Sequence, residues 1–183
     1  MIKAGIFLAD GFEEVEGLTV VDLLRRAGIE VETLSIMGRE LVESSHKVTI
    51  KADKLAEEAD YDSFDILVLP GGMPGTLNLG NSQIVQDNLQ KIQKEGKWLG
   101  AICAAPSVLG EAGLLKGKEA VCYPGFEEKL LGAKICFDSV KVDGKIITSR
   151  GMGTAIDFGL AIIEQLISKE KADEIGKGII YRV

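Results

Sequence analysis

Strand-like apolar segments alternate with helix-like segments along this chain, and no other feature of the sequence limits the possible folds as strongly. Strand composition occurs at residues 2–9, 31–37, 65–69 and 98–102. Helical patterns lie between them, at residues 13–27, which Gly28 ends, and at residues 82–95, which begin with the N-cap residue Ser82. Such alternation predicts an α/β fold, a mostly parallel sheet with helices on both faces.

The rest of the chain continues this pattern and adds a hairpin. Helices are expected at residues 106–112, 154–168 and 169–177, and a half-exposed strand at residues 47–50. Strands at residues 139–142 and 145–148 flank Asp143-Gly144, a pair typical of a two-residue hairpin turn. No linker divides the 183 residues, so residues 1–183 are expected to form a single domain.

Charge and cysteine content narrow the functional classes. The formal net charge is −7 without a basic cluster, which argues against nucleic acid and anionic membranes as partners. No uncharged apolar stretch of about eighteen residues occurs, so no membrane span is expected. Three cysteines without tight spacing do not suggest a disulfide framework, and this favours a reducing, cytoplasmic location.

Cys103 is placed where the apolar strand at residues 98–102 stops and a helix begins. Small residues on both sides, among them Gly100 and Ala104, allow a sharp turn with an exposed side chain, which is the geometry of a nucleophile elbow. A helix N-terminus favours the thiolate, so we expect a Cys103 pKa below the free value of about 8.5. The alternative is an inert cysteine in the core.

Two further segments follow strand ends and should meet Cys103 at the same edge of the sheet. The backbone N–H groups of Gly71 and Gly72 can hold an oxyanion, although such glycines also occur in ordinary turns. Glu16 lies one turn into its helix near the apolar face, where a carboxylate needs a partner. Glu13 and Glu14 are expected on a solvated face, because helix starts favour acids anyway.

The remaining polar and sulfur-containing residues are interpreted as structural. Arg150 follows another strand end and is expected to pair with acids near the site. Cys122 and Cys136 lie in apolar runs and are expected to be inert core residues. His46, the single histidine, is expected on the surface or at a dimer interface, and not in catalysis.

Several motifs occur in order along nearly the whole chain: FEEVE at residues 12–16, RRAG at 25–28, LPGG at 69–72, AICA at 101–104 and TSRGMGT at 148–154. With these motifs the chain resembles the ThiJ/PfpI superfamily and, within it, the branch of the parkinsonism-associated protein deglycase. The resemblance implies a flavodoxin-like three-layer sandwich and a homodimer. No cofactor and no metal are expected.

The resemblance also implies roles for individual residues. Cys103 is the nucleophile and an oxidation-sensitive thiol, and Glu16 matches the protonated glutamate beside it. The backbone of Gly71, Gly72 and Ala104 matches the side that faces the oxyanion or substrate, with Gly72 the closer glycine. We expect peroxide to oxidise Cys103 first and to stop at the sulfinic acid, because Glu16 can hydrogen-bond to one of its oxygens.

Two departures from the superfamily affect the expected activity. The branch usually has a His-Pro pair after the strand that follows the cysteine, and this chain has Tyr123-Pro124 there. The peptidase branch has a histidine directly after the cysteine, where this chain has Ala104. A cysteine peptidase and a glutamine amidotransferase both need an imidazole, and no histidine follows Cys103, so both activities are expected to be absent.

Two functions of different classes remain. In the first, a glyoxalase or deglycase, Cys103 adds to a small aldehyde or a glycated substrate and Glu16 moves the proton, with support from Tyr123 and Arg150. In the second, a stress-response binding protein, Cys103 oxidises and changes partner binding with little turnover. The physiological substrate or partner stays open.

Overall fold

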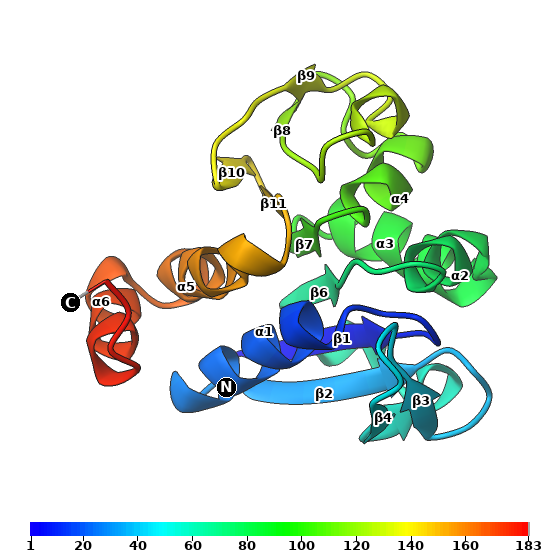
Figure 1. Cartoon of the computed structure of the whole chain (residues 1–183), viewed down its shortest axis with the longest axis horizontal. Coiled ribbons are helices and arrows are strands. Elements are labelled where there is room, and N and C mark those ends of the chain that lie inside the picture. Colours follow the sequence, from blue (N-terminus) through cyan, green and yellow to red (C-terminus); the bar gives the residue numbers. More distant parts are fainter. Residues whose placement is uncertain (183) are drawn as a thin grey trace.

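A seven-stranded sheet forms the centre of the protein in the computed structural model, which describes residues 1–182 (Figure 1). The strand order is β10-β11-β7-β6-β1-β2-β5, and every neighbouring pair is parallel except β10 and β11. The strands are β1 (Lys3–Leu8), β2 (Glu30–Ser35), β5 (Lys54–Leu55), β6 (Ile66–Leu69), β7 (Trp98–Ile102), β10 (Val140–Asp143) and β11 (Ile146–Ser149). The predicted mostly parallel sheet is confirmed.

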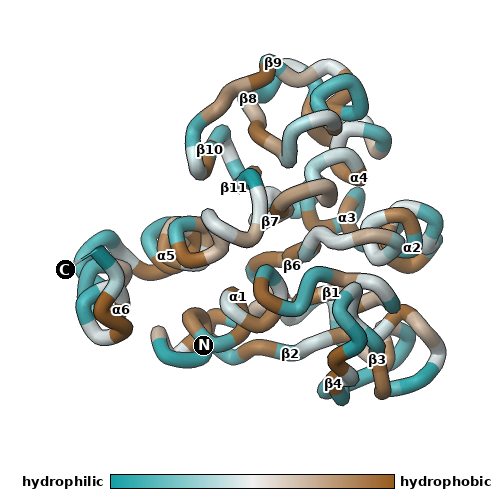
Figure 2. Tube along the Cα trace, viewed as in Figure 1, coloured by the Kyte–Doolittle hydropathy of each residue, from teal (hydrophilic) through white to brown (hydrophobic). Residues whose placement is uncertain are grey.

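Helices cover both faces of this sheet. They are α1 (Glu14–Arg26), α2 (Gly75–Asn81), α3 (Gln83–Lys94), α4 (Pro106–Glu111), α5 (Ala155–Leu166) and α6 (Lys169–Gly178). One apolar cluster, with Leu24 and Phe158, joins α1 and α5 to one face, and another, with Leu89 and Leu109, joins α3 and α4 to the other. In Figure 2 the apolar colouring gathers on β6 and β7, between these layers. Among residues 1–182, no helix combines the length and the apolar character needed to cross a membrane.

Two small sheets lie outside the central one. β3 (Leu41–Glu43) and β4 (Thr49–Lys51) pair antiparallel, and β8 (Glu119–Ala120) and β9 (Lys134–Ile135) pair parallel. Short 3₁₀ turns occur at Ala56–Glu58, Tyr61–Ser63, Glu127–Lys129 and Met152–Thr154. The strand predicted at residues 47–50 begins only at Thr49, because Ser45 and His46 form the turn between β3 and β4.

Two local predictions need correction. The hairpin turn is Gly144-Lys145, not Asp143-Gly144, since Asp143 pairs with Ile146. The Asp143 carboxylate accepts the Glu119 N–H at 2.8 Å, which holds this residue in its strand. Ser82 precedes α3 as predicted, but its side chain makes no cap hydrogen bond, because the residue also ends α2.

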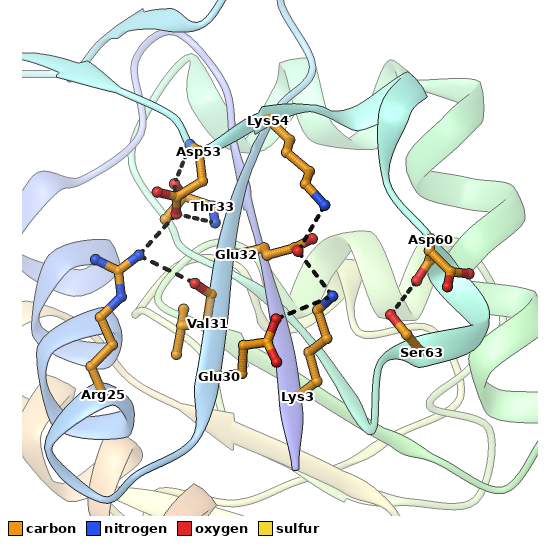
Figure 3. A network of polar contacts seen from close by, with 10 residues as sticks. All are labelled: Lys3, Arg25, Glu30, Val31, Glu32, Thr33, Asp53, Lys54, Asp60 and Ser63. Atoms are coloured by element: carbon orange, nitrogen blue, oxygen red, sulfur yellow. Dashed lines mark hydrogen bonds and ion pairs between the residues drawn. The ribbon is translucent and has the colours of Figure 1, made fainter. Parts of the chain in front are cut away.

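A polar network attaches the C-terminal end of α1 to the edge of the sheet (Figure 3). Arg25 on α1 lies 2.9 Å from the carboxylate of Asp53, which precedes β5. On β2, Glu32 lies between Lys3 and Lys54, with its Oε1 2.9 and 2.8 Å from their Nζ atoms. The Arg25 contact holds the C-terminal end of α1 against the segment before β5, and the Glu32 contacts join β2 to β1 and β5.

Candidate active site

Cys103 lies directly after β7 and before α4, at the carboxyl edge of the sheet. Its φ of 65° is in the left-handed region, which costs a non-glycine residue roughly 1–2 kcal/mol. Its N–H donates to the Ser149 carbonyl at 3.0 Å, and its carbonyl accepts the Tyr123 N–H at 2.8 Å. The predicted strand-to-helix turn is confirmed. The residue is partly exposed, so the alternative of a cysteine enclosed in the core does not hold.

Glu16 reaches Cys103 from the first turn of α1. It is 1% exposed, and its Oε2 accepts the Gly71 N–H at 2.9 Å. Its carboxyl group also lies close enough to the Cys103 thiol for each group to shift the pKa of the other. A Cβ on Gly71 would lie 2.5 Å from the Cys103 Cβ and 2.7 Å from Oε2 of Glu16, so glycine is what lets these three residues meet.

The backbone around the sulfur offers hydrogen-bond donors from two sides. Gly72 has a φ of 90°, and a Cβ there would lie 2.3 Å from the Glu13 nitrogen. The backbone N–H groups of Gly72 and Ala104 lie close enough to the Cys103 sulfur to lower the pKa of its thiol. The Gly71 N–H donates to Glu16, which leaves the N–H groups of Gly72 and Ala104 as the donors closer to the sulfur.

Burial controls the acid–base properties of the Glu16–Cys103 pair. Removal from water raises the pKa of Glu16 to about 7, against the lowering effect of hydrogen bonds from Cys103 and Gly71. Burial, and then the charge of Glu16 and its hydrogen bond to the thiol, raise the pKa of Cys103 to about 12. The prediction of a lowered thiol pKa is wrong, because these effects outweigh the N–H groups of Ala104 and Gly72.

The two groups therefore titrate together. While Glu16 is ionised, its negative charge keeps the proton on Cys103. Protonation of Glu16 removes that charge and makes ionisation of the thiol easier. A carboxyl group with a pKa of about 7 beside a thiol can accept and return a proton near neutral pH.

Comparison with known proteins agrees with this geometry. The family pattern of the DJ-1/PfpI family matches residues 2–165. The chain belongs to the DJ-1/PfpI family. The resemblance inferred from the motifs is thereby confirmed.

Individual DJ-1 relatives cover nearly the whole chain. Protein DJ-1 homolog B of Arabidopsis thaliana is 39% identical over 182 residues, which make up 98% of this chain but only 42% of that protein. Glutathione-independent glyoxalase DJR-1.2 of Caenorhabditis elegans is 32% identical over 90% of this chain and 88% of that protein. The solved structure of oxidized Toxoplasma gondii DJ-1 is 38% identical and matches with a TM-score of 0.96 over 100% of both chains. This similarity confirms the flavodoxin-like sandwich.

The DJ-1/PfpI site of this chain is bordered by an aromatic ring. Tyr123 is half exposed, and its ring lies 3.3 Å from the position that a Cβ on Gly151 would occupy. Oε1 of Glu16 lies 3.9 Å from the same position. Tyr123 thus lies near the acid–thiol pair, at the position where the branch usually has a histidine.

Arg150 lies at the same edge but does not pair with an acid. Its Nε donates to the Cys122 carbonyl at 3.4 Å, and its guanidinium carbon lies 5.8 Å from the centre of the Phe137 ring. Within residues 1–182 it forms no ion pair, so the predicted pairing with acids is wrong. Sequence reasoning also missed that Phe137 and Met152 are exposed here, because an apolar residue in a loop gives no sign of which way it faces.

Outside this DJ-1/PfpI site, His46 binds the two acids that were assigned to a solvated face. Its Nδ1 lies 3.1 Å from Oε1 of Glu14 and 3.5 Å from Oε2 of Glu13. Both glutamate side chains are only 13–14% exposed, so that assignment is wrong. The ligand atoms of the three residues lie within 4.8 Å of one another, an arrangement that the ion pairs account for.

The other two cysteines of this DJ-1/PfpI chain differ from each other. Cys122 is buried, as expected of a core residue. Cys136 follows β9 and is partly exposed, so its assignment to the core is wrong. The apolar neighbours of Cys136 belong to a peripheral sheet of two-residue strands, which cannot enclose it.

Proposed function

We propose that the protein converts α-oxo aldehydes to α-hydroxy acids without glutathione, with Cys103 as nucleophile and Glu16 as acid–base group. The observation that carries the proposal is the buried Glu16 carboxyl group beside the Cys103 thiol, where burial raises its pKa to about 7. A relative named as a glutathione-independent glyoxalase supports the same reaction class.

In the first stage, the Cys103 sulfur adds to the aldehyde carbon of methylglyoxal while Glu16 accepts the thiol proton. The N–H groups of Gly72 and Ala104 stabilise the negative charge that develops on the aldehyde oxygen. Return of the proton to this oxygen completes a hemithioacetal.

In the second stage, Glu16 removes the hydrogen of the hemithioacetal carbon as a proton and delivers it to the neighbouring carbon, while the proton of the hemithioacetal hydroxyl moves to the former ketone oxygen. The former aldehyde carbon is thereby oxidised and the former ketone carbon reduced, so no external oxidant is needed. The product is a thioester, which water hydrolyses to lactate and the free thiol. Addition of Cys103 to a glycated adduct, the deglycase reaction, begins in the same way.

Lactate formation from methylglyoxal tests the proposal. We expect activity in the wild-type protein, loss to background in Cys103→Ser, and retention in the control Cys136→Ser, whose partly exposed sulfur lies near the Lys134 carbonyl. Lactate formation by Cys103→Ser at the wild-type rate, or none by the wild type, would falsify the assignment. No hydrolysis of casein is expected, because no histidine follows Cys103.

The second candidate function is redox sensing. It is supported by the partial exposure of Cys103 and by the relative solved in an oxidized form. Peroxide oxidises the thiol to sulfenic and then sulfinic acid, with release of water at each step. Peptide mapping after graded peroxide should show sulfinate at Cys103 before any change at Cys122 or Cys136. Equal oxidation of all three cysteines would contradict a redox-sensing role for Cys103.

Assembly and location belong to the same proposal. We infer a cytoplasmic homodimer that uses the apolar surface of α1 and the first turn of α5, where Leu18, Leu23 and Ile156 line a groove. Val15 on the same helix and Ile180 beyond α6 are exposed large apolar residues. Light scattering should therefore give twice the chain mass of 19.6 kDa, and a monomer mass contradicts this inference.

A further inference from the structure

A hollow beside Cys103 is unused by the proposed chemistry. Its walls include Tyr123, Phe137, Arg150 and Met152, together with the backbone of Gly151. Three of these side chains are large and apolar yet strongly exposed: Tyr123 by 50%, Phe137 by 70% and Met152 by 57%. Exposed apolar side chains gathered in one concave place are typical of a surface that binds something.

The positive charge that lines this hollow, that of Arg150, forms no ion pair within residues 1–182. The chain has five arginines, and four of them form ion pairs with aspartates. Arg150 is the exception among residues 1–182. Glu127, whose charge also acts on neighbouring Cys122, accepts the Gly125 N–H at 2.7 Å instead. Arg150 lines the hollow and donates its Nε to the Cys122 carbonyl, and within residues 1–182 its guanidinium has no carboxylate partner.

The backbone register places this charge next to the nucleophile. Ile102 of β7 pairs with Ser149 of β11, so Cys103 and Arg150 follow on neighbouring parallel strands, which lie about 4.8 Å apart. The Tyr123 N–H bonds the Cys103 carbonyl, which brings the aromatic wall to the same point. A molecule whose carbonyl carbon is at the sulfur can therefore extend over the Tyr123 ring to the guanidinium.

We propose that this hollow selects carbonyl substrates that carry a carboxylate on an apolar or aromatic spacer. Arg150 binds the carboxylate, because a guanidinium matches its two oxygens in geometry and charge. The exposed rings of Tyr123 and Phe137 and the Met152 thioether cover the spacer. The inference rests on the proposed carbonyl chemistry of Cys103, and it makes Arg150 a specificity-determining residue.

Protection of Cys103 from alkylation tests binding without turnover. The probes are 4-(hydroxymethyl)benzoate and its neutral match 1,4-benzenedimethanol, and the readout is iodoacetamide labelling of Cys103 by peptide mass. In the wild type, the anion should protect at an about tenfold lower concentration than the neutral probe. Arg150→Gln should abolish this preference without altering protection by the neutral probe, and Arg150→Lys should retain part of it.

Equal protection by both probes in the wild type, protection by neither, or a preference that survives in Arg150→Gln overturns the proposal. The wild-type comparison decides the matter even if Arg150→Gln does not fold, which circular dichroism reveals. Because alkylation does not depend on catalysis, selective protection together with absent lactate formation refutes the proposed reaction alone. Lactate formation without selective protection refutes only the role of the hollow.

Discussion

Two carboxyl groups at the start of α1 have opposite properties although they are two residues apart. Glu16 has a raised pKa of about 7, because burial outweighs its hydrogen bonds. Glu14 is also largely enclosed, with a side chain 14% exposed, and burial raises its pKa too. Hydrogen bonds from its own backbone and from His46 and Ser44 outweigh burial, and the net pKa of Glu14 is lowered.

The comparison shows that burial and partners together separate the two carboxyl groups, because Glu16 is 1% exposed and Glu14 is only partly buried. Glu16 faces an amide N–H and a thiol, neither of which carries a positive charge. Glu14 faces an imidazole that becomes a cation when protonated. Helix α1 thus places one carboxyl group where it exchanges a proton near neutral pH and another where it stays ionised.

The largest expected difference between Glu16 and Glu14 is in activity, when each carboxyl group is replaced by its amide. We expect Glu16→Gln to lower lactate formation from methylglyoxal by about 10²–10⁴-fold, the usual effect of losing a general acid–base group. Glu14→Gln, the matched control, should stay within about twofold of the wild type, since it does not contact Cys103. Comparable losses in both variants would mean that the helix start matters as a whole and not through Glu16.

The pH dependence of stability gives the next largest effect. Folded Glu16 keeps its proton up to about pH 7, while in the unfolded chain it titrates near the ordinary value of 4.5. Between these values the folded state binds more protons, so the free energy of unfolding should fall as pH rises, by at most about 3 kcal/mol.

Urea unfolding at a series of pH values measures this contribution as the difference between wild type and Glu16→Gln. The difference between wild type and Glu14→Gln should change with pH in the opposite direction. The lowered pKa of Glu14 adds stability to the wild type, and this stability is lost as pH falls. If the free energy of unfolding changes with pH in the same way in the wild type and in Glu16→Gln, the pKa of Glu16 is not shifted by folding.

Gly71 provides a smaller test, because it supplies Glu16 with its backbone partner. In Gly71→Ala the new methyl group meets the Cys103 Cβ and the Glu16 carboxylate, so we expect a loss of roughly 1–3 kcal/mol in stability together with loss of activity. Gly178→Ala is the control, since a Cβ there meets nothing within 4 Å. Chemical denaturation of both variants shows whether the tight contact is real, and equal stabilities argue against it.

Much of the site was predictable because it depends on local patterns. The bounds of β7 and the turn at Cys103 follow from a continuous apolar run that meets small residues and Pro106. The burial of Glu16 follows from its place on the apolar face of α1.

The errors concern properties that distant parts of the chain determine. The Cys103 pKa depends on how completely α1 and the Gly71 loop exclude water, and no local pattern reports that. Arg150 could be placed at the strand end, but not the acids that would have to reach it. Glu13 and Glu14 look solvated until the β3–β4 turn brings His46 over them.

The smallest effect concerns His46 itself, whose NMR signals are unambiguous because the chain has a single histidine. The hydrogen bond and charge of Glu14, and then the charge of Glu13, raise the pKa of His46 above its ordinary value of 6.5. Because the folded pKa is raised, the ion pair contributes fully below about pH 6.5 and is lost as pH rises through the folded value. The contribution to stability is small, since the imidazole is 68% exposed and water screens the pair.

A titration followed by NMR should therefore give a His46 pKa above 6.5 in the wild type and a lower one in Glu14→Gln. Glu40→Gln is the matched control, because Glu40 pairs with Lys51 on β4 and not with the imidazole. A pKa unchanged by Glu14→Gln would show that His46 does not charge-pair with α1. The contrast between Glu14 and Glu16 would then have to come from burial and from the neutral hydrogen bonds that Glu14 accepts from its own backbone and from Ser44, since the imidazole is the one partner of Glu14 in the described chain that can carry a positive charge.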